Sequence, residues 1–169
     1  MTVTYDRIAT TTVSGTSTNT VTFSSISSAY TDIFAIASIA TISGTSSYLD
    51  MQFNSDTATN YSATTLFGAG STVGAGNLTN RTGIPCGITD ITSASNTFNT
   101  FLINVMNYAN TTTFKAALCR SEHTSNSIVG ASAGTWRNTN AINTIAFTFG
   151  SGNFRAGSTF TLYGIAREV

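Results

Sequence analysis

The sequence predicts an all-β fold, a two-sheet antiparallel β-sandwich that is jelly-roll-like and has about eight to ten strands. Helical periodicity is missing, because Ser, Thr, Asn and Gly interrupt every candidate stretch. Residues suited to a pleated surface are abundant: aromatic residues make up 11%, and about a third of the chain is Ser or Thr. Several segments alternate between apolar and polar residues, which is the period of a strand with one buried face.

Four strands are expected in the first third of the chain, at residues 3–13, 20–26, 30–42 and 48–54. The last of these is the clearest, because Leu49, Met51 and Phe53 fall on one face. Asp50 and Gln52 fall on the other face, as in a half-buried strand.

The segment at residues 30–42 is different, because both of its faces are apolar. Ile33 and Ile39 share one face, whereas Phe34, Ile36 and Ile42 share the other. We expect a loop or a second subunit to cover its outer face.

Five further strands are expected at residues 100–107, 112–122, 127–134, 141–149 and 158–167. In two of them the alternation predicts a buried face. Phe101, Ile103 and Val105 form this face in one strand, and Ile145, Phe147 and Phe149 form it in the other. Loops rich in Gly, Asn, Ser and Asp are expected at residues 14–19, 54–60, 68–80, 89–96 and 150–157, with 68–80 a long exposed loop.

A single domain spanning residues 1–169 is the simplest organisation, because no linker or shift in composition divides the chain. An immunoglobulin fold typically has about 100 residues. A jelly roll has room for longer loops, and we therefore favour it.

The charge pattern argues against nucleic acid and membrane as partners. Charged residues are only 8% of the chain, seven bases balance seven acids, and the bases are scattered singly. The most hydrophobic stretch, at residues 33–42, is far shorter than the roughly 20 residues of a membrane helix. A near-neutral protein repels its own copies weakly, which favours association.

The beginning of the sequence, residues 1–7, has no secretory pattern, so synthesis and folding in a bacterial cytoplasm are expected. Cys86 and Cys119 would then stay reduced. Their spacing fits no zinc or redox motif, which favours small buried hydrophobic residues. Sequence alone leaves open whether the two lie close together.

Catalytic patterns are missing, and we expect no catalytic, cofactor-binding or metal-binding residues and no enzyme activity. The single histidine, His123, is interpreted as a solvated turn residue, since no Gly-x-Ser-x-Gly elbow accompanies it. The loop Asn54 to Asn60 has oxygen ligands at alternate positions but lacks the Gly and Glu of a calcium loop, which favours Asx-turns. Whether this loop binds a cation stays open. Trp136 is interpreted as a core anchor, with sugar stacking as the alternative.

Three parts of the chain carry a family resemblance. They are AINTI (141–145), GNFRAGS (152–158) and LYGI (162–165) near the end; YDRIATTTV (5–13), VTFSSI (21–26) and YTDI (30–33) at the beginning; and FNSDTATNYS (53–62) in between. This pattern resembles a domain of tailed-bacteriophage structural proteins, including those of cyanophages. In longer relatives such domains sit in fibre or tail proteins after an attachment region, and the sequence shows no such region.

The resemblance implies a virion structural protein without catalytic residues. Its first implication is a capsid decoration or cement protein, a homotrimer on the outer surface of the head that stabilises contacts between major capsid protein subunits. The alternative is a tail fibre, baseplate or head-fibre module that binds host-surface glycan through residues 68–80 and Trp136. A third hypothesis, a cell-wall hydrolase acting through His123, has little support.

Overall fold

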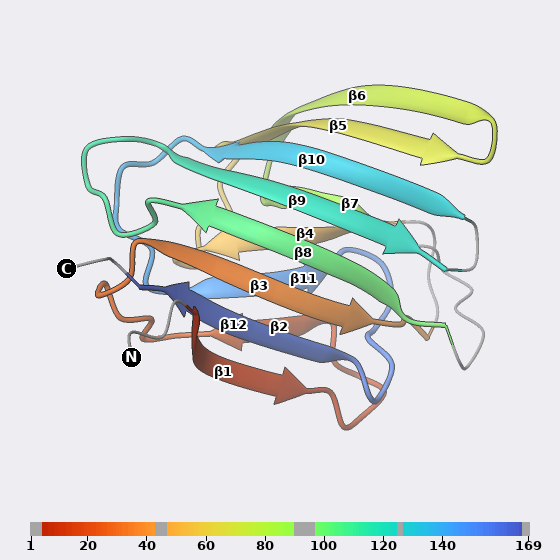
Figure 1. Ribbon diagram of the computed structural model, residues 1–169, viewed down its shortest axis with the longest axis horizontal. Helices are drawn as coiled ribbons and strands as arrows, with labels where there is room; N and C mark the ends of the chain where they lie inside the picture. Colours follow the sequence, from red (N-terminus) through yellow and green to blue (C-terminus); the bar gives the residue numbers. More distant parts are fainter. Residues whose placement is uncertain (1–4, 43–46, 90–96, 125–126, 167–169) are drawn as a thin grey trace.

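The computed structural model describes residues 5–42, 47–89, 97–124 and 127–166. In these residues the chain forms twelve strands in two antiparallel sheets and no helix (Figure 1). The strands are β1 (Tyr5–Thr12), β2 (Thr20–Phe23), β3 (Asp32–Ile39), β4 (Ser47–Phe53), β5 (Tyr61–Ala69), β6 (Thr72–Arg81), β7 (Ile84–Thr89), β8 (Asn99–Met106), β9 (Lys115–His123), β10 (Ile128–Trp136), β11 (Ile145–Phe149) and β12 (Thr159–Ile165).

The strand order confirms the predicted fold class. The larger sheet has the order β1-β12-β3-β8-β9-β10-β5-β6, and the smaller sheet has the order β2-β11-β4-β7. Pairing is nested along the chain: β1 pairs with β12, β2 with β11, β3 with β8 and β4 with β7. Among these eight, successive strands change sheet except from β4 to β7, which pair with each other, and the result is the wrapped double sheet of a jelly roll.

Two hairpins are inserted into this arrangement. The hairpin β5–β6 lies between β4 and β7 in the chain, and the hairpin β9–β10 lies between β8 and β11. Both join the larger sheet beyond β8, in the order β9-β10-β5-β6. We call these four strands the sheet extension.

The expectation of a long exposed loop at residues 68–80 is wrong, because most of these residues belong to the β5–β6 hairpin. β5 and β6 pair on either side of the two-residue turn Gly70–Ser71, where Gly70 adopts a φ of 59°. The ring of Phe67 covers Gly74, where a Cβ atom would lie 2.4 Å from that ring. Residues 61–69 and 84–89 also form strands that the sequence did not predict.

The core lies between the two sheets and contains the predicted faces. All of the following side chains are buried: Leu49, Met51, Phe53, Phe101, Ile103, Val105, Ile145, Phe147 and Phe149. The sheets approach closely at Gly134 of β10, where a Cβ atom would lie 2.3 Å from Cγ2 of Ile84 on β7. A side chain at this position would therefore overpack the core.

The two faces of β3 are occupied as predicted, but no described loop covers the outer one. Ile33 and Ile39 are buried in the core, whereas Phe34 and Ile36 are half-buried on the outer face of the larger sheet. Strands next to β3 and at the sheet edge supply partial cover: Tyr5 lies against Phe34 with ring centroids 6.0 Å apart in an edge-to-face arrangement.

Candidate interaction surface

Four large apolar side chains project into solvent from the outer face of the sheet extension. Leu66 is 57% exposed, Val73 85%, Leu118 44% and Val129 62%. They come one each from β5, β6, β9 and β10, and they point outward because side chains alternate along a strand. We call these four residues the apolar patch.

The strand register brings three of the four together. Val129 pairs with Gly68, and Gly68 pairs in turn with Val73 on the other side. The missing side chain at Gly68 leaves a shallow hollow of about 560 Å³, which Leu66 and Val129 line. Arg120 is the charged side chain at this hollow. Arginine is enriched in protein interfaces, and the fully buried centre of an interface is more apolar than the rest of the surface.

A second apolar hollow lies on the same outer face, near the opposite edge of the larger sheet. It has a volume of about 260 Å³ and is lined by Tyr5, Phe34, Ile36 and Tyr163. The outer face therefore exposes apolar side chains at both ends, whereas a solvated sheet face normally carries polar ones.

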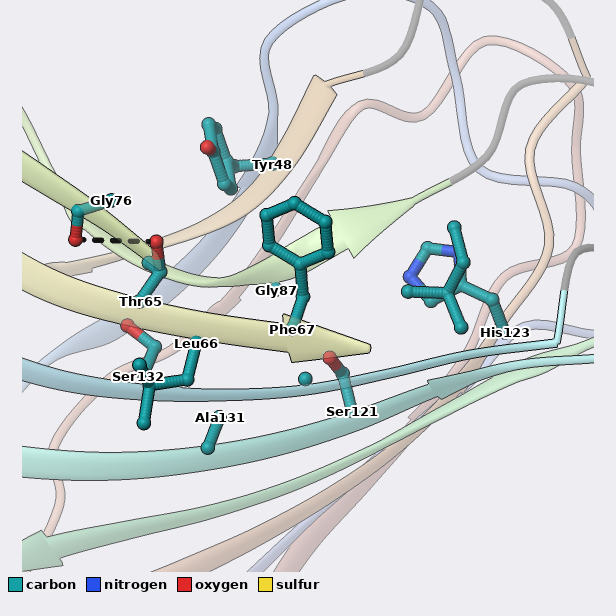
Figure 2. A pocket seen from close by; sticks show the side chains of 12 residues that line it. Tyr48, Thr65, Leu66, Phe67, Gly76, Gly87, Ser121, His123, Ala131 and Ser132 are labelled. Carbon is teal, nitrogen blue, oxygen red and sulfur yellow. Dashed lines mark hydrogen bonds between the residues drawn. The ribbon is translucent and has the colours of Figure 1, made fainter. Parts of the chain in front are cut away.

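A small cavity of about 100 Å³ lies beneath the sheet extension, between it and the smaller sheet (Figure 2). Its lining includes Phe67, Ser121, His123 and Ser132. His123 is only 2% exposed, so the interpretation as a solvated turn residue is wrong. The residue ends β9 on the same inward face as Ser121 and packs edge-to-face against Phe101, with ring centroids 6.4 Å apart.

The cavity does not assemble a catalytic triad from the described residues. Its lining contains a histidine and serines but no carboxylate that could orient the imidazole. The hydroxyl of Ser132 is buried without a hydrogen-bond partner in the described part of the chain. The residues around His123 therefore do not form the arrangement that the hydrolase hypothesis requires.

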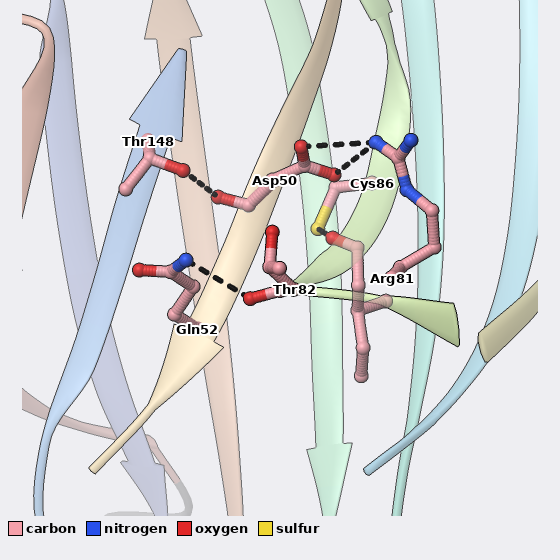
Figure 3. A network of polar contacts seen from close by, with 7 residues as sticks. Asp50, Gln52, Arg81, Thr82, Cys86 and Thr148 are labelled. Carbon is pink, nitrogen blue, oxygen red and sulfur yellow. Dashed lines mark hydrogen bonds and ion pairs between the residues drawn. The ribbon is translucent and has the colours of Figure 1, made fainter. Parts of the chain in front are cut away.

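Arg81 at the end of β6 and Asp50 on β4 form an ion pair that joins the two sheets at the base of the sheet extension (Figure 3). Nη2 of Arg81 lies 3.2 Å from a carboxylate oxygen of Asp50, and the guanidinium stands 5.5 Å from the centroid of the Tyr48 ring. Burial raises the pKa of Asp50 to about 6, although the positive charge of Arg81 opposes this shift.

The two cysteines are buried and free, as predicted. Cys86 on β7 and Cys119 on β9 interact across the two sheets, so they lie close together. Burial raises the pKa of the Cys86 thiol, and the neighbouring Cys119 adds to the shift. The thiolate form of Cys86 is therefore disfavoured. Both cysteine side chains are buried in the core.

The loop from Asn54 to Asn60 forms the predicted Asx-turn. Oδ1 of Asp56 accepts the backbone N–H of Ala58 at 2.9 Å, and Oδ2 accepts the Asn60 amide at 2.9 Å and the indole N–H of Trp136 at 2.8 Å. Trp136 is 1% exposed, which confirms it as a core anchor. The carboxylate is thus occupied by protein donors.

In the described ranges, no three or more His, Cys, Asp or Glu side chains are grouped so as to hold a metal ion. No helix among the described residues is long and apolar enough to cross a membrane. Comparisons with protein-family models, curated proteins and solved structures gave no match. The resemblance to tailed-phage structural proteins therefore stays a prediction.

Sequence reasoning did not find the apolar patch. One pattern could have located half of it: Gly70–Ser71 between two strand-forming runs is typical of a two-residue hairpin turn. That hairpin would have placed Leu66 and Val73 on one face of a strand pair.

Proposed function

We propose that this protein is a virion structural protein of a tailed phage, specifically a capsid decoration or cement protein that binds major capsid protein on the outside of the head. The observation that carries the proposal is the apolar patch, which stands on a wide sheet of a jelly roll. The sequence resemblance supports a location in a phage particle. The apolar patch supports a surface through which the protein could bind to that particle.

Such a protein would act passively. Covering exposed Leu66, Val73 and Val129 removes apolar area from water, at roughly 25 cal/mol per Å². Arg120 at the hollow can pair with an acceptor on the partner. A sheet bound across two neighbouring capsid subunits would resist their separation without any chemical step.

The test is co-sedimentation of the purified protein with phage heads that lack it. We expect the wild type to pellet with the heads and Val129→Lys to remain in the supernatant. Thr22→Lys is the matched control, because it adds the same charge at an exposed position of β2 on the smaller sheet. Absence of the wild type from the pellet, or equal binding by both variants, would refute the proposal.

One observation favours a second candidate, a glycan-binding module of a tail fibre, baseplate or head fibre. A polar hollow of about 480 Å³ is lined by Ser28, Tyr30, Thr31, Asn107 and Asn110, whose hydroxyls and amides suit sugar hydroxyls. Trp136 and residues 68–80, which the sequence suggested for this role, do not line it. Glycan-array binding that is lost in Thr31→Ala would support this candidate.

A further inference from the structure

The two sheets have four edges, and three of them are protected against pairing with another chain. β1 carries Asp6 and Arg7 and has a bulge between Arg7 and Ala9. β2 is only four residues long. β7 contains Pro85 and pairs with β4 through an irregular register. Charges, bulges, proline and shortness are the features by which native sheets block edge-to-edge association.

The fourth edge, β6, lacks these features over most of its length. It is the outermost strand of the larger sheet, and no segment of the described residues pairs with its free edge (Figure 1). From Thr72 to Leu78 its pairing with β5 is regular, and this stretch has no charge and no proline. The irregularity and the positive φ of Asn80 come only after Leu78.

The turn fixes which backbone groups point outward. Ala69 and Thr72 flank the two-residue turn, so they form a hydrogen-bonded pair. Hydrogen-bonded and non-hydrogen-bonded pairs alternate along an antiparallel ladder. The N–H and C=O groups of Val73, Ala75 and Asn77 therefore point away from β5, toward the open edge.

We propose that β6 pairs antiparallel with β6 of a second copy of this chain, about a two-fold axis at Ala75. This position is the middle of the regular stretch, so Ala75 would exchange both hydrogen bonds with its own copy. Val73 would exchange both with the partner's Asn77, and the reverse pair would follow by symmetry. Every outward group of the three residues is then satisfied.

The side chains of this stretch are compatible with such a pairing. Gly74 and Gly76 would face each other across the new ladder on the inner face, where small residues allow close approach. On the outer face Ala75 would meet its own copy, and Leu66, which pairs with Ala75 on the β5 side, would flank it in both copies, so the two apolar patches are linked through Ala75. No like charges meet, because β6 carries its charge at Arg81.

A second copy is the occupant that the edges favour. A head-to-tail contact would need a second open edge on the same chain, and β1, β2 and β7 are protected. A two-fold contact uses the same edge twice. The pairing does not depend on the proposed role in a virion, so its failure would leave that role untouched.

The oligomeric state is measured by sedimentation velocity across a concentration series. We expect a dimer for the wild type and for Thr12→Lys on the β1 edge, and a monomer for Ala75→Lys, because its ammonium group would meet its own copy across the axis. Ala75→Pro is tolerated within the hairpin, because the N–H of Ala75 faces away from β5. It removes two hydrogen bonds from the dimer and should raise its dissociation constant about thirtyfold or more (about 2 kcal/mol).

A cysteine pair tests the axis itself. Ala75→Cys would meet its own copy at a Cα separation of about 5.5 Å, within disulfide range, and should form covalent dimers on mild oxidation. Asn77→Cys is the control, because its copy would lie about 14 Å away along the strand. A monomeric or trimeric wild type overturns the proposal. So does a dimer in which Ala75→Cys forms no disulfide, even if Ala75→Pro fails to fold.

Discussion

Replacing Asp56 by alanine should destabilise the protein, because three donors share this one carboxylate. They are the indole N–H of Trp136, the side-chain amide of Asn60 and the backbone N–H of Ala58, all within 2.9 Å. The carboxylate thus ties the turn after β4 to the last residue of β10.

The three donors differ in what happens after the substitution. Trp136 is 1% exposed, so its indole N–H would lose its partner with little access to water, at about 2 kcal/mol. Ala58 and Asn60 lie nearer the surface and can turn to water, so each loss costs about 0.5 kcal/mol. The sum is about 3 kcal/mol, which should lower the melting temperature by about 10 °C.

Urea unfolding followed by tryptophan fluorescence measures this difference, because Trp136 is the single tryptophan. Asp32→Ala is the matched control: Asp32 accepts the backbone N–H of Asn107 at 2.6 Å and has an equivalent charge. We expect about 1 kcal/mol for the control. If Asp56→Ala costs no more than Asp32→Ala, the network at Trp136 does not stabilise the fold as argued.

The pH dependence of the same variant provides a second check. Burial acts to raise the pKa of Asp56, but hydrogen bonds from Asn60, Trp136 and Ala58 outweigh it and hold the pKa below its usual 3.8. A lowered pKa in the folded state contributes stability above the unfolded value and loses it as the pH falls through the folded value. The stability difference between wild type and Asp56→Ala should therefore shrink in acid.

Three further predictions concern the core. Burial raises the pKa of Asp50 from 3.8 to about 6, so the folded state keeps a proton that the unfolded chain has released between these values. Stability should fall by up to about 3 kcal/mol as the pH rises through this window, and Asp50→Asn should lose that component in urea titrations at several pH values. Gly134→Ala should cost about 1–3 kcal/mol through overpacking, whereas Gly15→Ala, with no atom within 4 Å of the new Cβ, should leave thermal stability unchanged. Cys86 and Cys119 should not react with Ellman's reagent in the native protein and should both react after unfolding; a native thiol that reacts would contradict their burial.

The sequence predicted the strands whose faces differ strongly in polarity. Leu49, Met51 and Phe53 alternate with polar residues, and all three are buried. The β5–β6 hairpin was not predicted, because Gly, Ala and Thr dominate it and apolar and polar residues do not clearly alternate along it. Its pairing depends on contacts across strands, such as the Phe67 ring over Gly74, which no single-strand pattern contains.

The location of the surface could not be predicted for a related reason. Leu118 and Val129 are apolar residues in strands, and their sequence pattern is the same as that of core residues. Only the pairing of β9 and β10 with their neighbours shows which face is covered by the smaller sheet. His123 was predicted to be exposed but is buried. Its polar neighbours suggested a turn, whereas the alternation along β9 places it on the same inward face as Cys119 and Ser121.

The nested pairing of β1 with β12 has a consequence for synthesis. β1 has no neighbour in its sheet except β12, and Tyr5 pairs with Ile165. During translation β1 must therefore stay without its partner in this sheet until β12 has been made. The larger sheet is therefore completed only once β12 has been made, and the pairing of two strands so far apart in sequence makes this step slow.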